Sequence, residues 1–150
     1  MNSEIGSAQH KKKLSTTNYS VFLVDDDEKI LQLYKSYFKK FNKFKLYTFS
    51  NELDALSQIS LIKPDLLLLD IFLSRLDGFK VNDIIRKNHI LDKTKIIAIS
   101  SVRTVQDKAL LSGIDDYFYK GDYLHILYMK IQKILGRSKK NESGNKTSTK

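Results

Sequence analysis

Five short runs rich in apolar, β-branched or aromatic residues recur along the chain, separated by longer segments of mixed polarity. The runs are Ser20 to Val24, Phe44 to Phe49, Asp65 to Asp70, Lys95 to Ser100 and Tyr117 to Tyr119. Several of them contain no polar break, which is typical of a strand buried on both faces. The pattern therefore predicts five strands, most of them in the interior of a sheet.

The most apolar run is Leu66-Leu67-Leu68-Leu69, followed by Asp70. Four leucines alone do not distinguish a buried strand from a buried helix. Pro64 bars a helix interior upstream and Asp77-Gly78 signals a turn downstream, so a strand is predicted. Asp70 then stands at the carboxyl end of a central strand, where open α/β sheets bind ligands. The alternative is that Asp70 merely caps the following turn.

Between the strands, apolar positions recur at helical spacing and predict five amphipathic helices. The first helix begins at Asp27 or Glu28, and the second spans 51–60 behind a cap at Ser50 or Asn51. The third follows Gly78, the fourth ends at a left-handed Gly113, and the fifth ends near Gly136. Because each strand is followed by a helix, the chain is expected to form an α/β fold, a parallel sheet wound on both faces.

Composition limits the class of protein. The length of 150 residues favours one domain, and there is no cysteine for disulfides or thiolate metal sites. No apolar run approaches the roughly 20 residues that span a bilayer, and the N-terminus lacks the apolar core of a signal peptide. We therefore expect a cytoplasmic protein without a membrane span.

The net charge of +9 is concentrated at the two ends of the chain. Residues 19–136 carry 18 Lys and Arg against 15 Asp and Glu, a balance of only +3. We expect residues 1–18 and 137–150 to be disordered basic tails around one domain, residues 19–136, and nucleic acid is not an expected partner.

Polar groups follow most of the predicted strands. The first strand ends in Asp25, Asp26 and Asp27, the third in Asp70, the fourth in Ser100 and the fifth in Lys120. In a parallel sheet these ends share one edge, so several carboxylates would lie close together and require a cation. Oxygen-only ligands favour Mg²⁺. With a lysine and a hydroxyl beside it, such a site suits a phosphoryl group, and Asp70 could be its nucleophile.

With these groups in this order, the chain resembles a response-regulator receiver domain of two-component signalling over roughly residues 19–136. The matching stretches are Val24 to Asp27, Leu68 to Asp70, Asp77 to Phe79, Ile97 to Ser101 and Lys108 to Lys120. No single stretch is decisive, but five in this order are specific. The resemblance implies a flavodoxin-like doubly wound (βα)5 fold with a five-stranded parallel sheet in the order 2-1-3-4-5.

The resemblance also implies roles for individual residues. Asp70 corresponds to the phosphoacceptor, and Lys120 and Ser100 to the lysine and hydroxyl that assist it. Ser100 and Tyr117 correspond to a conformational switch, in which the tyrosine ring turns inward once Ser100 has moved toward the phosphoryl group.

For the metal, the resemblance implies Asp26 and Asp70 as direct Mg²⁺ ligands, with Asp25 acting through water and Phe72 through its backbone carbonyl. Phe72 and Val102 occupy the two positions that flank the water attacking the phosphoryl group. Because neither side chain can orient a water molecule, slow dephosphorylation is predicted.

The sequence departs from the family pattern at two loop positions. Ser74 stands where the family usually has proline four residues after the phosphoacceptor, and Gly121 stands where it usually has proline after the lysine. Neither change removes a reacting group. Because a cis peptide without proline costs about 3 kcal/mol, the Lys120-Gly121 peptide is predicted to be trans.

The predicted function is that of a phosphoacceptor, not an enzyme, although it assists its own phosphorylation and dephosphorylation. The expected partners are a histidine kinase or histidine phosphotransfer protein and a downstream protein bound by the last two helices and the fifth strand; a homodimer is left open. About 14 residues follow the last helix, which suggests a stand-alone receiver in a relay or a chemotaxis-like system.

Other phosphate-handling functions fit the sequence less well. A haloacid-dehalogenase-type phosphatase needs a second aspartate where this chain has Phe72, and the scattered glycines form no phosphate-binding loop. His10, His89 and His125 show no metal-ligand spacing, which argues against a phosphohistidine carrier. Two alternatives remain open: a receiver that regulates a larger output protein, and a basic-tailed nucleic-acid-binding protein that uses the receiver as a scaffold.

Overall fold

The computed structural model describes residues 18–143, and side chains as far as Arg137. Five parallel strands form one sheet in the order β2-β1-β3-β4-β5, as expected. The strands are β1 (Tyr19–Val24), β2 (Phe44–Phe49), β3 (Leu66–Asp70), β4 (Lys95–Ser100) and β5 (Asp116–Tyr119). The helices are α1 (Glu28–Phe38), α2 (Glu52–Ile62), α3 (Gly78–Arg86), η1 (His89–Leu91), η2 (Arg103–Val105), α4 (Gln106–Leu111) and α5 (Leu124–Ser143).

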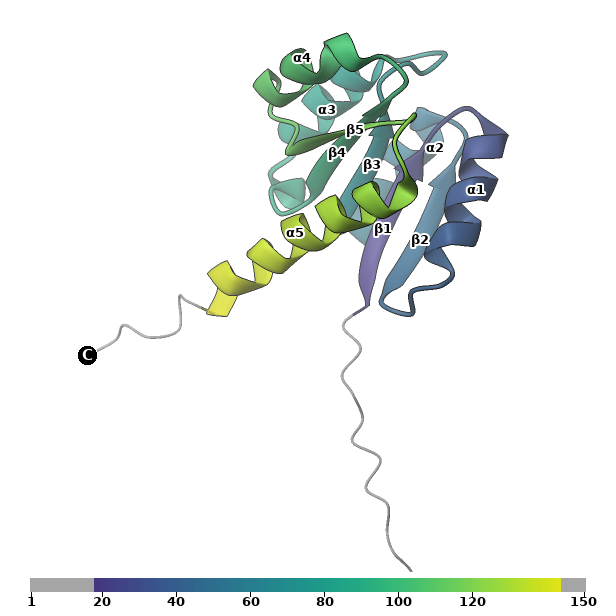
Figure 1. Ribbon diagram of the computed structural model, residues 1–150. Coiled ribbons are helices and arrows are strands. Elements are labelled where there is room, and N and C mark those ends of the chain that lie inside the picture. Colours follow the sequence, from purple (N-terminus) through teal and green to yellow (C-terminus); the bar gives the residue numbers. More distant parts are fainter. Residues whose placement is uncertain (1–17, 144–150) are drawn as a thin grey trace, which may run out of the picture.

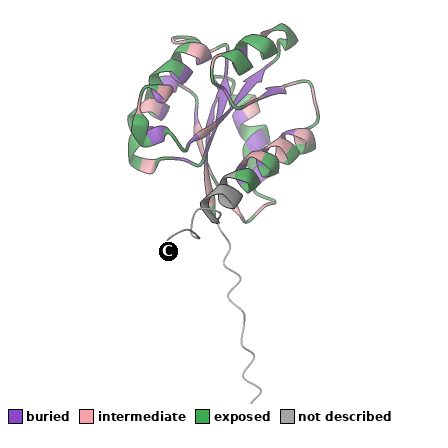
Figure 2. Ribbon diagram, turned by 90° about the vertical axis from the view of Figure 1, so that its left-hand side faces the viewer, coloured by how far each residue is buried: buried purple, intermediate pink, exposed green. Residues whose placement is uncertain are grey.

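The helices cover the sheet on both sides, which confirms the α/β doubly wound architecture (Figure 1). The helices α1 and α5 pack on one face, and α2, α3 and α4 pack on the other. In β3, Leu66 and Leu68 belong to the first of these cores, whereas Leu67 and Leu69 belong to the second. The run of four leucines is thus a strand buried on both faces, and each leucine contributes about 1.5–3 kcal/mol through burial. The central strands are accordingly the most buried part of the molecule (Figure 2).

Local signals fix where the helices begin and end. Asp27 caps α1 by accepting a hydrogen bond from Lys29 N at 2.9 Å. Asn51 caps α2 by accepting hydrogen bonds from Leu53 N and Asp54 N. After α4, Gly113 has φ of 87°, the left-handed conformation predicted for it. The side-chain caps of Asp27 and Asn51 satisfy backbone N–H groups that a helix start leaves without partners.

The last helix is longer than expected. We predicted that it ends near Gly136 and that a disordered tail begins at Arg137, but α5 continues to Ser143. The added segment contains helix-forming residues and no proline, so a single glycine, at a cost of about 1 kcal/mol, does not end the helix. The remaining parts of the expected tails, residues 1–17 and 144–150, lie outside the described residues. Within the described part of the chain, no helix is long and apolar enough to cross a membrane.

Candidate functional site

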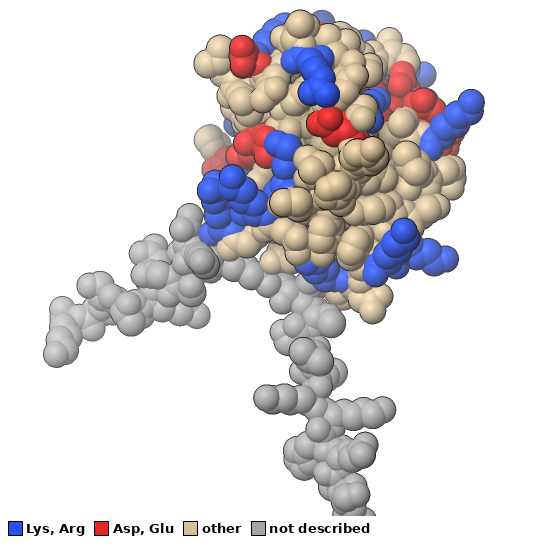
Figure 3. Space-filling view, in the orientation of Figure 1, with Lys and Arg blue, Asp and Glu red and all other residues tan. Residues whose placement is uncertain are grey.

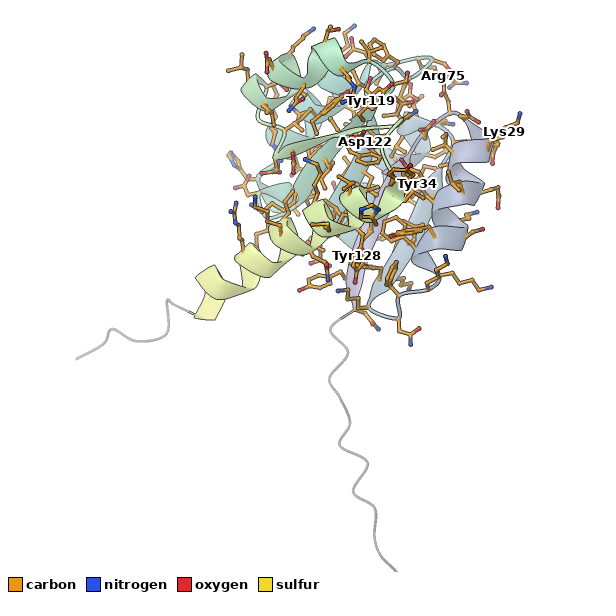
Figure 4. All side chains as sticks on the ribbon, viewed as in Figure 1. Lys29, Tyr34, Arg75, Tyr119, Asp122 and Tyr128 are labelled. Carbon is orange, nitrogen blue, oxygen red and sulfur yellow. The ribbon has the colours of Figure 1, made fainter. Side chains whose placement is uncertain are left out.

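The carboxyl ends of the strands form the edge that the sequence predicted to hold the site. Figure 4 labels Tyr119, the last residue of β5, and Arg75 and Asp122, which lie in the loops that follow β3 and β5. The loop after β3 turns back tightly there, because Gly78 N donates a hydrogen bond to Ile71 O at 2.8 Å. A Cβ atom at Gly78 would lie only 2.6 Å from Asp70 O, so the close approach requires glycine. The turn thereby fixes the backbone that carries Asp70.

Three carboxylates come together at this edge. One oxygen from each of Asp25, Asp26 and Asp70 lies within 4.8 Å of the others. The side chain of Asp25 is fully buried, Asp70 is 4% exposed and Asp26 is exposed. Asp27 is absent from this group because its carboxylate caps α1. On the face shown in Figure 3, one group of acidic side chains lies at the upper right of the domain, and others lie at its left.

Lys120 provides the nearest positive charge. Its Nζ lies 2.7 Å from Asp25 Oδ2 and 3.2 Å from Asp70 Oδ2. The Lys120 backbone N–H donates to Ser100 O at 2.9 Å and so ties the end of β5 to the end of β4. One ammonium group therefore bridges the two buried carboxylates, and the site keeps an excess of negative charge.

Electrostatics make Asp70 an unusual carboxyl group. Burial and the neighbouring Asp25 raise the pKa of Asp70 from 3.8 to about 6, although Lys120 and the Phe72 N–H, which donates to Asp70 Oδ1 at 3.1 Å, oppose the shift. Burial lowers the pKa of Lys120, but its close contact with Asp25 and the charges of both carboxylates outweigh burial and raise that pKa. A carboxyl group that resists ionisation as Asp70 does is typical of a functional site. Burial and the charges of Asp25 and Asp70 also raise the pKa of Tyr34, a residue of α1 that is labelled in Figure 4.

The residues present fit a hard divalent cation. The donors are all carboxylate oxygens, which Mg²⁺ prefers. In addition, the buried Asp25 Oδ2 accepts no hydrogen bond of good geometry within the described residues, although Lys120 lies close to it. A buried carboxylate oxygen that is held by an ion pair alone keeps lone-pair positions for a metal or a metal-bound water. The role of the Phe72 carbonyl stays a prediction.

Ser100, the last residue of β4, and Tyr117, near the start of β5, both hydrogen-bond the backbone of Val102. Ser100 is fully buried, and its Oγ accepts a hydrogen bond from Val102 N at 3.0 Å. Tyr117 donates its hydroxyl to Val102 O at 2.7 Å, and burial raises its pKa. The tyrosine is only 4% exposed. Its hydroxyl contact to the backbone of Val102 satisfies the polar end of a ring whose body is buried. That the ring turns on phosphorylation stays a prediction.

Two polar contacts at this edge were missed from the sequence. Ser74 Oγ donates to Asp26 Oδ2 at 2.5 Å, and Glu52, only 2% exposed, accepts from Leu76 N at 2.7 Å. Ser74 carried a signal, since it replaces an expected proline. Glu52 carried none, because an acid in the first turn of a helix is usually solvated. The Lys120-Gly121 peptide is trans, as predicted, since no described peptide bond is cis.

Comparison with known proteins identifies the domain. Residues 21–129 match the response regulator receiver domain family. The chain is 34% identical over 124 residues to the uncharacterized transcriptional regulatory protein YvcP of Bacillus subtilis, covering 80% of this chain and 50% of that protein. It is 32% identical over 126 residues to the nisin biosynthesis regulatory protein NisR of Lactococcus lactis, covering 83% and 53%.

A solved structure agrees with these relatives. The receiver domain of Francisella response regulator 1452 is 28% identical, with a TM-score of 0.73, and the match covers 81% of this chain and 99% of that one. The chain spans about half the length of the curated relatives it matches. The family match, the strand order and the acidic edge agree with one another, and the chain belongs to the response regulator receiver domain family.

Proposed function

We propose that the protein accepts a phosphoryl group on Asp70 from a phosphohistidine of a histidine kinase or phosphotransfer protein. The observation that carries the proposal is the bridge from Lys120 to a buried Asp70, within 4.8 Å of two further carboxylates. An Asp70 oxygen would form a bond to phosphorus as the donor's phosphorus–nitrogen bond breaks, and the leaving imidazole would take up a proton from solvent. The product is an aspartyl phosphate.

Each group near Asp70 has a role in this transfer. Lys120 Nζ, 3.2 Å from Asp70 Oδ2, would stay beside the phosphoryl oxygens and offset their charge. Asp26, Asp70 and, through water, Asp25 would hold Mg²⁺, which supplies the positive charge that a phosphoryl group requires. The Ser100 hydroxyl, which accepts from Val102 N, keeps its own proton to donate to a phosphoryl oxygen.

The proposed consequence is a change of the surface formed by α4, β5 and α5, which would alter binding of a downstream protein. Receiver domains generally act in this way as signalling partners of histidine kinases and not as enzymes. The expectation that this receiver acts alone stays a prediction. Its relatives YvcP and NisR are named as regulatory proteins, one of them transcriptional, and the match covers about half of each.

A second candidate function follows from those relatives: the receiver as the input half of a transcriptional regulator. This weakens the expectation that nucleic acid is not a partner, because a linked output domain could contact DNA. The transfer chemistry at Asp70 is the same in both cases. What differs is the protein or domain that responds to the phosphoryl group.

The test is phosphorylation of the full chain by acetyl phosphate. With Mg²⁺, intact mass spectrometry should show one added phosphoryl group, and neutral hydroxylamine should remove it because acyl phosphates react with amines. With EDTA in place of Mg²⁺, the modification should be lost. A phosphoryl group that resists hydroxylamine, or one that forms equally well in EDTA, would contradict the proposal.

We further predict that the aspartyl phosphate is long-lived. Phe72 and Val102 lie in the loops that follow Asp70 and Ser100, and they are 53% and 38% exposed. Neither side chain can hydrogen-bond a water molecule, and Phe72 is large enough to crowd its path to phosphorus. Phe72→Asn and Val102→Glu should each speed the loss of phosphate in Mg²⁺ buffer, by roughly 10- to 100-fold, since a positioned polar group assists the attacking water.

The matched control is Leu111→Asn, because Leu111 is an exposed apolar residue at the end of α4. Phosphate loss is measured by quenching samples over time and recording intact mass. Loss within seconds in the unaltered protein, or an unchanged rate in both variants, would show that these side chains turn away from the water's path.

A further inference from the structure

The loop between β3 and α3 contacts the acidic cluster through one side chain. Ser74 Oγ donates a hydrogen bond of 2.5 Å to Asp26 Oδ2, although the two residues are 48 positions apart in the sequence. Both residues are exposed. The contact joins the loop that follows the phosphoacceptor strand to the loop that follows β1.

Asp26 differs from the other two carboxylates in how it is held. Asp25 is buried and accepts from Asp27 N at 2.9 Å. Asp70 is buried and accepts from Phe72 N and from Lys120. For Asp26, by contrast, Ser74 is the one hydrogen-bond partner found among the described residues. Without it, an exposed side chain would be free to choose among rotamers, most of which point away from the cluster.

Ser74 is itself presented from an anchored loop. The buried Glu52 of α2 accepts from Leu76 N at 2.7 Å, and Gly78 N donates to Ile71 O at 2.8 Å. These two contacts fix the loop on both sides of Ser74. The hydroxyl is therefore held in place from β3 and α2, and it transmits that position to Asp26.

We propose that Ser74 is a positioning residue of the cation site: its hydroxyl holds the Asp26 carboxylate toward Asp25 and Asp70 before the ion binds. The inference rests on the proposed function, which makes this cluster the Mg²⁺ site. A carboxylate has about four lone-pair positions, so accepting one hydrogen bond at Oδ2 leaves others for a cation. Because the Asp26 side chain is ordered before the ion arrives, less conformational entropy is lost on binding. This should raise the affinity for Mg²⁺ by roughly three- to tenfold.

The test is a Mg²⁺ titration of the unphosphorylated full chain, followed by backbone amide NMR shifts, with no phosphodonor present. Ser74→Ala should weaken Mg²⁺ binding by roughly three- to tenfold. Ser74→Thr, which keeps the hydroxyl, should bind within about twofold of the unaltered protein. The matched control is Ser36→Ala, an exposed serine of α1 outside the cluster. Thermal unfolding without Mg²⁺ should be equal in all four proteins.

Two outcomes would overturn the inference alone. Affinity that is unchanged or higher in Ser74→Ala would show that the hydroxyl does not prepare the site or competes with the ion. Equal weakening in Ser74→Ala and Ser74→Thr would assign the effect to loop packing. If the unaltered protein binds no Mg²⁺, the proposed function fails together with the inference. Phosphorylation of Ser74→Ala at saturating Mg²⁺ should reach the unaltered level, which separates the two failures.

Discussion

Asp70→Asn is expected to abolish phosphorylation and, in metal-free buffer at about pH 7.5, to stabilise the fold. Phosphorylation is lost because an amide lacks the charged oxygen that attacks phosphorus. The gain in stability arises because Asp70 is a buried carboxylate beside the buried Asp25. Asparagine keeps the shape and removes that repulsion, while Lys120 retains its contact of 2.7 Å with Asp25.

The sign of the effect follows from the pKa of Asp70, which is about 6 in the folded protein against 3.8 for an exposed carboxyl group. Between these values the folded state binds more protons than the unfolded state, so the free energy of unfolding falls as pH rises through this window. Above about pH 6 the full penalty applies, and two pKa units correspond to about 3 kcal/mol. Below about pH 4 the penalty vanishes.

The measurement is urea unfolding followed by circular dichroism, at several pH values and without divalent ions. The difference in unfolding free energy between Asp70→Asn and the unaltered protein should be positive near pH 7.5 and shrink toward pH 4. Asp83→Asn, at an exposed position on α3, provides the control with the same chemical change. A variant that is less stable at every pH, or that still gains a phosphoryl group, would refute the account of Asp70.

The fold could be predicted well because its signals are local and agree with one another. The four leucines of β3, the cap at Asn51 and the left-handed Gly113 each act over a few residues. The grouping of Asp25 with Asp70 also followed, since parallel strands place their carboxyl ends on one edge. These inferences required topology but no knowledge of side-chain rotamers.

What could not be predicted depends on contacts between distant loops. The hydrogen bond from Ser74 to Asp26 and that from Leu76 N to Glu52 join segments that no local pattern links. The position of the Tyr117 hydroxyl depends on a backbone carbonyl, that of Val102, to which it donates. A sequence shows which residues reach an edge, but rotamers there are decided by which polar partners the folded loops offer.

Lys120→Met should have the opposite effect on stability from Asp70→Asn, and a similarly large effect on phosphorylation. Lys120 is the one cation in ion-pair contact with Asp25 and Asp70 among the described residues. Without it, Asp25 remains fully buried with no counter-ion, and breaking such a pair costs about 3–5 kcal/mol. Because Lys120 also lowers the pKa of Asp70, its loss should raise that pKa further and leave fewer Asp70 carboxylates ionised near neutral pH.

The expected result for Lys120→Met is a fall in the rate of phosphorylation by acetyl phosphate of roughly 10²- to 10³-fold, as when one charge-stabilising donor is removed. In metal-free urea unfolding the variant should be less stable than the unaltered protein, and Mg²⁺ should restore part of the loss by offsetting the charge of the same carboxylates.

Lys130→Met is the control, because Lys130 also pairs with an aspartate, Asp116, away from the acidic cluster. Lys120→Arg should rescue stability more than rate, since a guanidinium supplies the charge but cannot occupy the compact position of an ammonium between two oxygens. Phosphorylation at an unchanged rate in Lys120→Met would mean that the bridge to Asp70 is structural, and that the charge developing on the phosphoryl group is offset elsewhere in the site.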